Sequence, residues 1–184
     1  FSLLQGDEIV DEFKFLSINH NIKLMYQLRD EYSLGEILEQ ARSEKSWKNL
    51  REYIRVFEEY STYLTQNQKR MTMSFLYDNL IHPEDDIRRH SAEILGTLIS
   101  DFDEDYRKEL PDKVVINKDS DSKTLLREFM DLLIYPSHKI IPAQRSWILN
   151  SAPIMVSSLF MSAKEPMIKE YRNIILEYFN GVEG

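Results

Sequence analysis

The sequence predicts an all-α fold built from helical hairpins, and three observations point to it. Apolar residues recur at three- and four-residue steps along most of the chain, which is the spacing of one helix face. Only residues 114–116 read as a β-branched run, and they lie in a polar stretch. The 184 residues include only 5 glycines and 6 prolines beside 42% hydrophobic residues, a composition typical of a folded, helix-rich protein.

In the first part of the chain, apolar spacing predicts helices over about 7–18 and 21–31, and a short helix that reaches about residue 44. Ser33 and Glu36 have capping-box spacing, in which two side chains satisfy the orphan amides at a helix start. Ser46 is the expected cap of the next helix, whose predicted buried stripe is Leu50, Tyr53, Ile54, Phe57, Tyr60 and Leu64.

Two further helices flank a proline-bearing turn. Thr65 and Gln68 have the spacing of a second capping box and open one helix, which we expect to end at His82 because the residue before a proline is disfavoured in helical torsions. Pro83 suits the first turn of the following helix, where acidic residues 84–86 favour the positive end of the helix dipole. Residues beyond that helix, 101–121, form the longest irregular stretch.

Three helical segments are predicted after this stretch. The Asp-Ser-Asp-Ser cluster at 119–122 can cap an amphipathic helix that stops before Pro136. Residues 140–160 are apolar and helical, but Pro153 lies among them, so we expect a kink or a break near Ala152. A final helix is expected over about 163–179, closed by Gly181.

We expect these helices to form one domain over residues 1–184, because two independent domains would be cramped in this length. Within it, residues 1–45 are N-terminal helices or a cap. Residues 46–121 are hairpins followed by an acidic loop, and residues 122–184 are a second repeat with the C-terminal helix.

The composition excludes several kinds of site. The chain has no cysteine, which excludes disulfides, thiolate zinc sites, iron–sulfur clusters and cysteine nucleophiles, and favours a reducing compartment. No apolar run approaches the roughly 20 residues that cross a bilayer. We therefore expect a cytoplasmic protein without a membrane segment, and the start at Phe1 suggests a segment of a longer protein.

The charge distribution bears on the partner. Net charge is −8, with 8 acidic and 4 basic side chains in residues 101–121 but 6 acidic and 7 basic side chains in residues 122–184. The acidity is therefore concentrated before residue 122. Such a balance opposes long-range attraction to phosphate backbones and anionic lipids, so nucleic acid is disfavoured as a partner.

The helical pairs on either side of the acidic stretch repeat one another. A hairpin alone cannot cover its apolar face, so stacked hairpins are the physical solution. A shift of 53 residues superimposes the apolar and proline positions of the two pairs: Leu76 on Phe129, Leu80 on Leu133, Ile81 on Ile134, Pro83 on Pro136, Ile87 on Ile140 and Leu95 on Ile148.

Residues 76–98, LYDNLIHPEDDIRRHSAEILGTL, resemble a unit of the HEAT-like (armadillo-type) helical repeat family: an apolar helix, a turn with proline, then an acid and a base leading a second apolar helix. The resemblance implies a right-handed α–α superhelix of antiparallel hairpins, in which Asp86 and Arg88 make turn-bracing hydrogen bonds between neighbours. It implies a fold rather than a function, because repeat scaffolds bind many unrelated partners.

No catalytic, cofactor or metal site is predicted. The histidines, His20, His82, His90 and His138, lack the spacing that puts metal ligands on one helix face. Four aspartates match positions 1, 3, 5 and 12 of a calcium loop, but Tyr106 replaces its turn glycine, so a solvated acidic loop is the better interpretation; they are Asp101, Asp103, Asp105 and Asp112.

The sequence contains no motif for phosphate binding or nucleophilic catalysis, since it has no Gly-rich loop and no Gly-x-Ser-x-Gly elbow. The arginines at 51, 55, 88 and 89 could bind phosphates, but their acidic neighbours favour a salt-bridged surface. Some aromatic residues could anchor a protein partner, although the helical stripes place most of them in the core: Trp47, Tyr53, Tyr60, Tyr63 and Trp147.

The function expected by elimination is a non-catalytic protein-interaction or scaffolding module, which binds a protein, a peptide or other domains of its parent chain and needs no cofactor. Two alternatives stay open. One is a helical accessory or regulatory domain of a larger enzyme, for example one that handles nucleotides, with the catalytic residues outside this chain. The other is a nucleic-acid-binding helical repeat. The sequence identifies no partner-binding residues and no oligomeric state.

Overall fold

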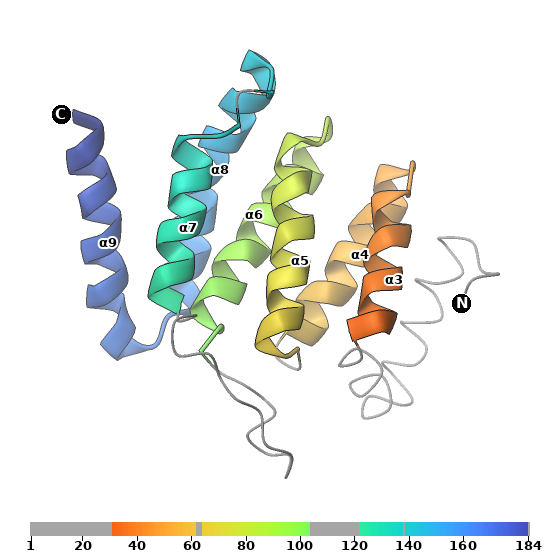
Figure 1. The fold of residues 1–184 in the computed structure, drawn as a ribbon, viewed down its shortest axis with the longest axis horizontal. Coiled ribbons are helices and arrows are strands. Elements are labelled where there is room, and N and C mark those ends of the chain that lie inside the picture. Colours follow the sequence, from red (N-terminus) through yellow and green to blue (C-terminus); the bar gives the residue numbers. More distant parts are fainter. Residues whose placement is uncertain (1–30, 62–63, 104–121, 138, 184) are drawn as a thin grey trace, which may run out of the picture. The chain divides into compact units, whose positions relative to one another are not determined.

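A computed structural model describes residues 31–61, 64–103, 122–137 and 139–183 of the chain. The prediction of an all-α fold is confirmed for this part, whereas the predicted helix at 7–18, residues 21–30 of the second predicted helix and the run 114–116 lie outside it. The elements are α3 (Glu31–Arg42), α4 (Trp47–Tyr60), α5 (Gln66–Asp78), the 3-10 helix η2 (Asn79–Ile81), α6 (Asp85–Ser100), α7 (Ser122–Ile134), α8 (Pro142–Ser162) and α9 (Glu165–Glu183) (Figure 1).

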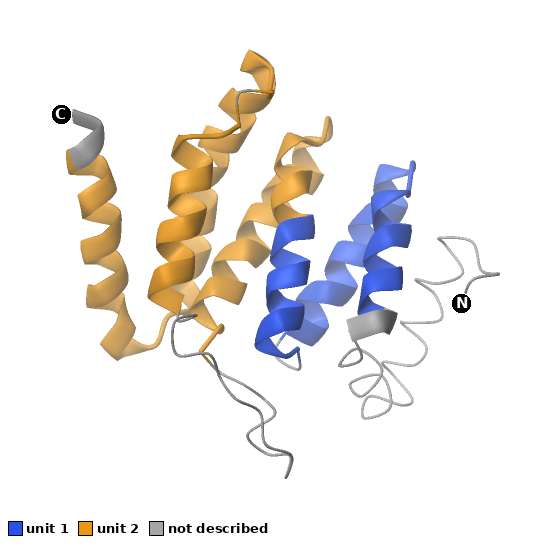
Figure 2. Cartoon of the chain, viewed as in Figure 1, with its two compact units in different colours: residues 1–75, 105–112 blue, residues 76–104, 113–184 orange. Residues whose placement is uncertain are grey.

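The chain divides into two compact units (Figure 2). Among the described elements, unit 1 holds α3, α4 and α5 as far as Phe75. Unit 2 begins at Leu76 and holds the end of α5 together with η2, α6, α7, α8 and α9.

The core of unit 1 is built on the apolar stripe that the sequence predicts for α4. Every residue of that stripe is buried, from Leu50 to Leu64. Phe57 meets Phe75 of α5 edge to face, with 5.6 Å between the ring centroids. The Arg42 guanidinium at the end of α3 lies 5.5 Å from the Phe75 ring centroid, so the aromatic pair joins all three helices.

The capping box predicted at the start of α5 is confirmed. The Thr65 backbone N–H donates to Gln68 Oε1 at 3.0 Å, and the Gln68 backbone N–H donates to Thr65 Oγ1 at 3.1 Å. Two amides that no helix carbonyl can reach are thereby satisfied.

Other predicted helix ends differ from the structure. Ser33 lies inside α3, which already begins at Glu31, so Ser33 does not cap this helix. Ser46 precedes α4 as predicted, but its side chain makes no capping hydrogen bond. The prediction that Gly181 closes the last helix is wrong, because α9 continues to Glu183. A glycine within a helix costs only about 1 kcal/mol, which the rest of the helix can offset.

Unit 2 has two layers of helices (Figure 1). Helices α6 and α8 run in the same direction and pack extensively against each other, while α7 and α9 run in the opposite direction and pack together in front of them. Of the predicted kink or break near Ala152, the break does not occur, since α8 is one helix from Pro142 to Ser162. Pro153 is exposed, so water can hydrogen-bond the carbonyl that loses its partner.

Helices α6 and α8 approach each other most closely at Gly96. A Cβ atom at this position would collide with the Met155 carbonyl oxygen and would lie 2.8 Å from the Leu159 nitrogen. At the neighbouring residue, the Thr97 and Ser158 hydroxyls are 3.0 Å apart, and the Ser158 hydroxyl donates to the Glu93 carbonyl. Small and hydroxyl side chains therefore let the two backbones come into direct contact.

Replacing Gly96 with alanine should push these helices apart. The added methyl group meets backbone rather than a flexible side chain, so Gly96→Ala should lower the free energy of unfolding by about 3 kcal/mol, as measured by urea unfolding.

The matched control is Gly35→Ala in α3. There the added Cβ would lie 3.8 Å from Met71 Cε, an ordinary van der Waals contact. Because alanine is the better helix former, this variant should be more stable by about 0.5–1 kcal/mol. Equal stability of Gly96→Ala and the wild type would contradict the close approach.

Candidate functional site

The described part of the chain contains two of the four aspartates that match a calcium loop, Asp101 and Asp103. Asp105 and Asp112 lie outside it. Both oxygens of Asp103 accept hydrogen bonds from Ser122, from the backbone N–H at 2.9 Å and from the hydroxyl at 2.7 Å. Asp103 thus caps the start of α7, and no group of three or more possible metal ligands is found among the described residues.

Ser122 is also unsuited to act as a nucleophile. Its hydroxyl is fully buried, donates to Asp103 and accepts a hydrogen bond from the Tyr171 hydroxyl at 2.8 Å. A catalytic serine needs access to substrate and a base that takes its proton. This buried network instead ties the end of α6 to the start of α7 and to α9.

Arg88 holds the turn between η2 and α6. Its guanidinium donates to the carbonyls of His82 at 2.6 Å and Pro83 at 2.9 Å, and it lies 4.3 Å from the ring centroid of Trp147 on α8. The bonds therefore brace the turn that precedes its own helix, and stacking on Trp147 adds a contact to α8. A group with these partners is a structural clamp rather than a phosphate site.

The other charged candidates are also paired on the surface. Arg55 pairs with Glu52 at 3.3 Å, Arg89 pairs with Asp85 at 3.3 Å, and His90 lies 3.3 Å from Asp86. Pairs of this kind, three or four residues apart, stabilise a helix weakly. Their charges are already engaged with neighbouring side chains, so they do not indicate a ligand site. Two of the histidines, His20 and His138, lie outside the described residues.

The aromatic residues considered as partner anchors are mostly inside the protein. Tyr53 and Tyr60 are buried, while Trp47 and Trp147 are half-buried. Tyr63 lies outside the described residues. The large apolar side chains that are exposed belong mainly to the C-terminal part: Tyr135, Ile141, Leu149, Met161, Ile168, Leu176 and Phe179.

Helix α8 has an unusual composition for a helix with a solvent-exposed side. Its 21 residues include one charged residue, Arg145. The side towards α6 is buried, with Ile148, Ser151, Met155 and Leu159. About a third of a turn away, α8 carries an exposed or half-exposed apolar stripe, consisting of Leu149, Pro153, Val156 and Phe160. None of the described helices has the length and apolar character needed to cross a membrane.

Helix α9 carries a second exposed stripe. Tyr171, Ile174 and Ile175 are buried, on the side that packs against α7. About a quarter turn away, exposed side chains follow one another at steps of three and four residues, which places them on one side of the helix: Ile168, Arg172, Leu176 and Phe179. Phe179 is 63% exposed, and Leu149 of the first stripe is 53% exposed.

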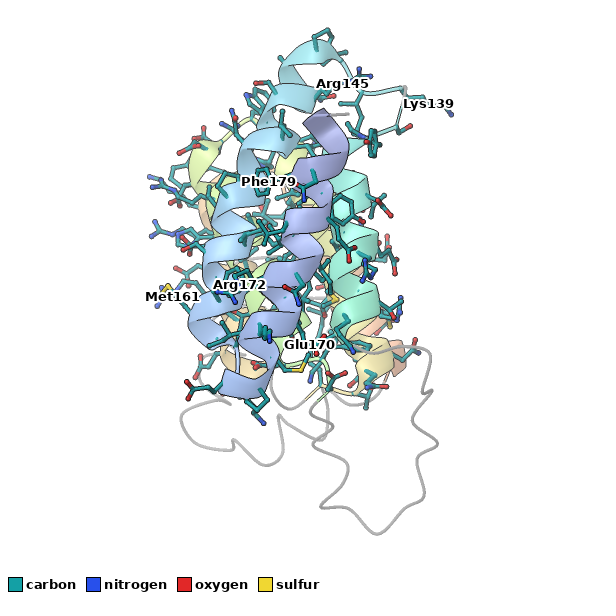
Figure 3. The ribbon with its side chains drawn as sticks, turned by 90° about the vertical axis from the view of Figure 1, so that its left-hand side faces the viewer. Lys139, Arg145, Met161, Glu170, Arg172 and Phe179 are labelled. Carbon is teal, nitrogen blue, oxygen red and sulfur yellow. The ribbon has the colours of Figure 1, made fainter. Side chains whose placement is uncertain are left out.

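The two stripes lie on the same side of unit 2. Figure 3 looks onto α8 and α9 from this side and shows Arg172 and Phe179 between the two helices. Helix α9 packs against α7 and makes no comparable contact with α8. We call the two stripes together the α8–α9 face. The face offers apolar and aromatic side chains and one guanidinium, that of Arg172, and this composition suits the binding of a protein surface.

Sequence reasoning found the apolar character of residues 140–160 but not its consequence. The absence of charged residues from Ser146 to Ser162 was the available signal, because the solvent-facing side of a helix normally carries charged or polar residues.

Comparison with known proteins finds no matching family model, no similar curated protein and no similar solved structure.

The turn that Arg88 braces should make the protein sensitive to acid. Burial lowers the pKa of His82 below its ordinary value of 6.5 and outweighs the opposite effect of Glu84. The unfolded chain then binds a proton more readily than the folded one, so this contribution to stability is complete above pH 6.5 and declines as the pH falls below it.

Urea unfolding at pH 7.5 and 5.5 measures this decline. The loss of stability between the two pH values should be smaller in His82→Gln than in the wild type. An NMR titration of His82 checks the cause directly, and a midpoint above 6.5 would contradict it.

Proposed function

We propose that this chain is a non-catalytic protein-interaction or scaffolding module that binds its partner through the α8–α9 face. The observation that carries the proposal concerns α8. This helix of 21 residues contains one charged residue, and only one side of the helix is buried. Exposed contiguous apolar surface of this kind marks an interaction site more often than it marks ordinary solvent-facing surface.

The types of side chain on the face support this function. Aromatic residues and arginine are enriched at the centres of protein interfaces, and the face offers Phe160, Phe179 and Arg172. Among the described residues, the Ser122 hydroxyl and the Asp103 carboxylate are bonded to each other, and the His90 ring lies 3.3 Å from Asp86.

The finer fold proposed is a HEAT-like right-handed stack of hairpins. The 53-residue internal repeat of the sequence supports it. In such a stack each hairpin is covered by the next one. The last hairpin has no such cover, so its apolar side chains are exposed and can bind a partner.

The experiment is affinity capture with the full chain as bait, washed at high salt and quantified by mass spectrometry. Leu149→Asn combined with Phe179→Asn should reduce retention of a discrete protein by about tenfold or more, because truncated interface anchors cost at least one to two kcal/mol each. Both positions are exposed in the free chain, so the variant should remain folded.

The matched control is Met161→Gln combined with Tyr135→Asn. These side chains are 86% and 69% exposed but lie outside both stripes. The control should retain the partner as the wild type does. If the face variant and the control behave alike, the α8–α9 face is not the binding surface.

A further inference from the structure

We infer that the α8–α9 face binds one amphipathic α-helix that carries an acidic residue opposite Arg172. This inference rests on the proposed function and adds the chemistry of the partner. It stands on three features of the structure: the relation of α8 to α6, the shape of the two stripes, and the charges around them.

The packing of α8 on α6 shows what kind of element fits beside α8. The 53-residue shift places Leu149 where α6 has Gly96. Gly96 is the point at which α8 covers α6, whereas Leu149 is 53% exposed. The side of α8 that corresponds to the covered side of α6 is thus open, and a helix is the element that covers the equivalent position.

The two stripes match such a helix in length. The α8 stripe extends from Leu149 to Phe160, and the α9 stripe extends from Ile168 to Phe179. At 1.5 Å per residue, each covers about 16 Å, or three helical turns. Figure 3 shows α8 and α9 beside each other on this side of unit 2, so one helix laid over both would contact both stripes.

The charges on this side indicate an acidic partner. Two acids of α9 are already paired with α7, Glu170 with Lys123 at 4.0 Å and Glu177 with Arg127. Arg172 has no ion pair with any acid among the described residues, and it lies one turn from Ile168 and one turn from Leu176. A partner that covers the stripe must therefore pair this guanidinium or leave its charge desolvated, which is costly.

Most of the other charged side chains near the face are also positive. Arg145 is the one charged residue of α8 and is exposed near its N-terminus, where Figure 3 shows it together with Lys139. Lys169 is exposed next to the α9 stripe. Glu165 is the opposing charge, two turns from Arg172 at the start of α9.

A second copy of this chain fits the face less well. A twofold contact centred on the α9 stripe brings the two Arg172 guanidiniums towards each other. Shifting the two helices to pair Arg172 with Glu165 of the copy moves Leu176 and Phe179 beyond the end of the opposing helix. In the first arrangement the two Arg172 side chains repel each other, and in the second half of the α9 stripe stays uncovered.

The test is selection from a displayed library of helical peptides that is randomised along one face, with the full chain as the target. Peptides that bind the wild type should share apolar residues at steps of three and four and an acidic residue in the central turn. Selection on Arg172→Glu should replace that acid with lysine or arginine. Each peptide should prefer its own target by about tenfold, measured by fluorescence anisotropy.

Arg89→Glu on α6 is the control, since Arg89 is exposed, belongs to neither stripe and pairs with Asp85 of its own helix; it should select the same acidic peptides as the wild type. The inference would be overturned if no helical peptide were enriched. It would also be overturned if the peptides selected on Arg172→Glu carried the same charge as those selected on the wild type. A concentration-dependent dimer by light scattering that Leu149→Asn with Phe179→Asn dissociates would overturn it in favour of self-association. Loss of the captured protein in that face variant, without any effect of Arg172→Glu, would leave the proposed function standing and reject only the acidic helix.

Discussion

The direct backbone contact between α6 and α8 at Gly96 is the constraint on which the arrangement of unit 2 depends. Because the two backbones touch there, the rotation of α8 about its axis is fixed, with Met155 and Leu159 turned inward. The side of α8 that carries Leu149 and Pro153 is then turned outward, whatever its composition. The exposed apolar stripe follows from this contact and from the absence of charge between Ser146 and Ser162.

A buried hydrogen-bond network fixes α9 in a comparable way. Asp103 at the end of α6 holds Ser122 at the start of α7, and Tyr171 of α9 reaches the same hydroxyl. The Tyr178 hydroxyl adds bonds to the Arg127 carbonyl and to Asp131 on α7, and burial followed by the bond to Asp131 raises the pKa of Tyr178. With the polar side of α9 held in this way, Ile168, Leu176 and Phe179 stay in solvent.

The sequence predicted the local structure better than the candidate site. Helical spacing and the Thr65–Gln68 box were sufficient because they depend on neighbours in sequence. The cap of α7 was missed because its acceptor, Asp103, is 19 residues away. The α8–α9 face was missed for a similar reason: spacing shows that a helix side is apolar, but only packing shows which side is left uncovered.

Site-specific photo-crosslinking in the source cells tests most directly whether the face is covered. A photoreactive phenylalanine derivative would replace Leu149 or Leu176, one residue on each stripe, and Met161 as an exposed position outside them. The account predicts one discrete crosslinked product of the same mass from positions 149 and 176, and none from position 161. Crosslinks of equal strength from all three positions, or from position 161 alone, would contradict it.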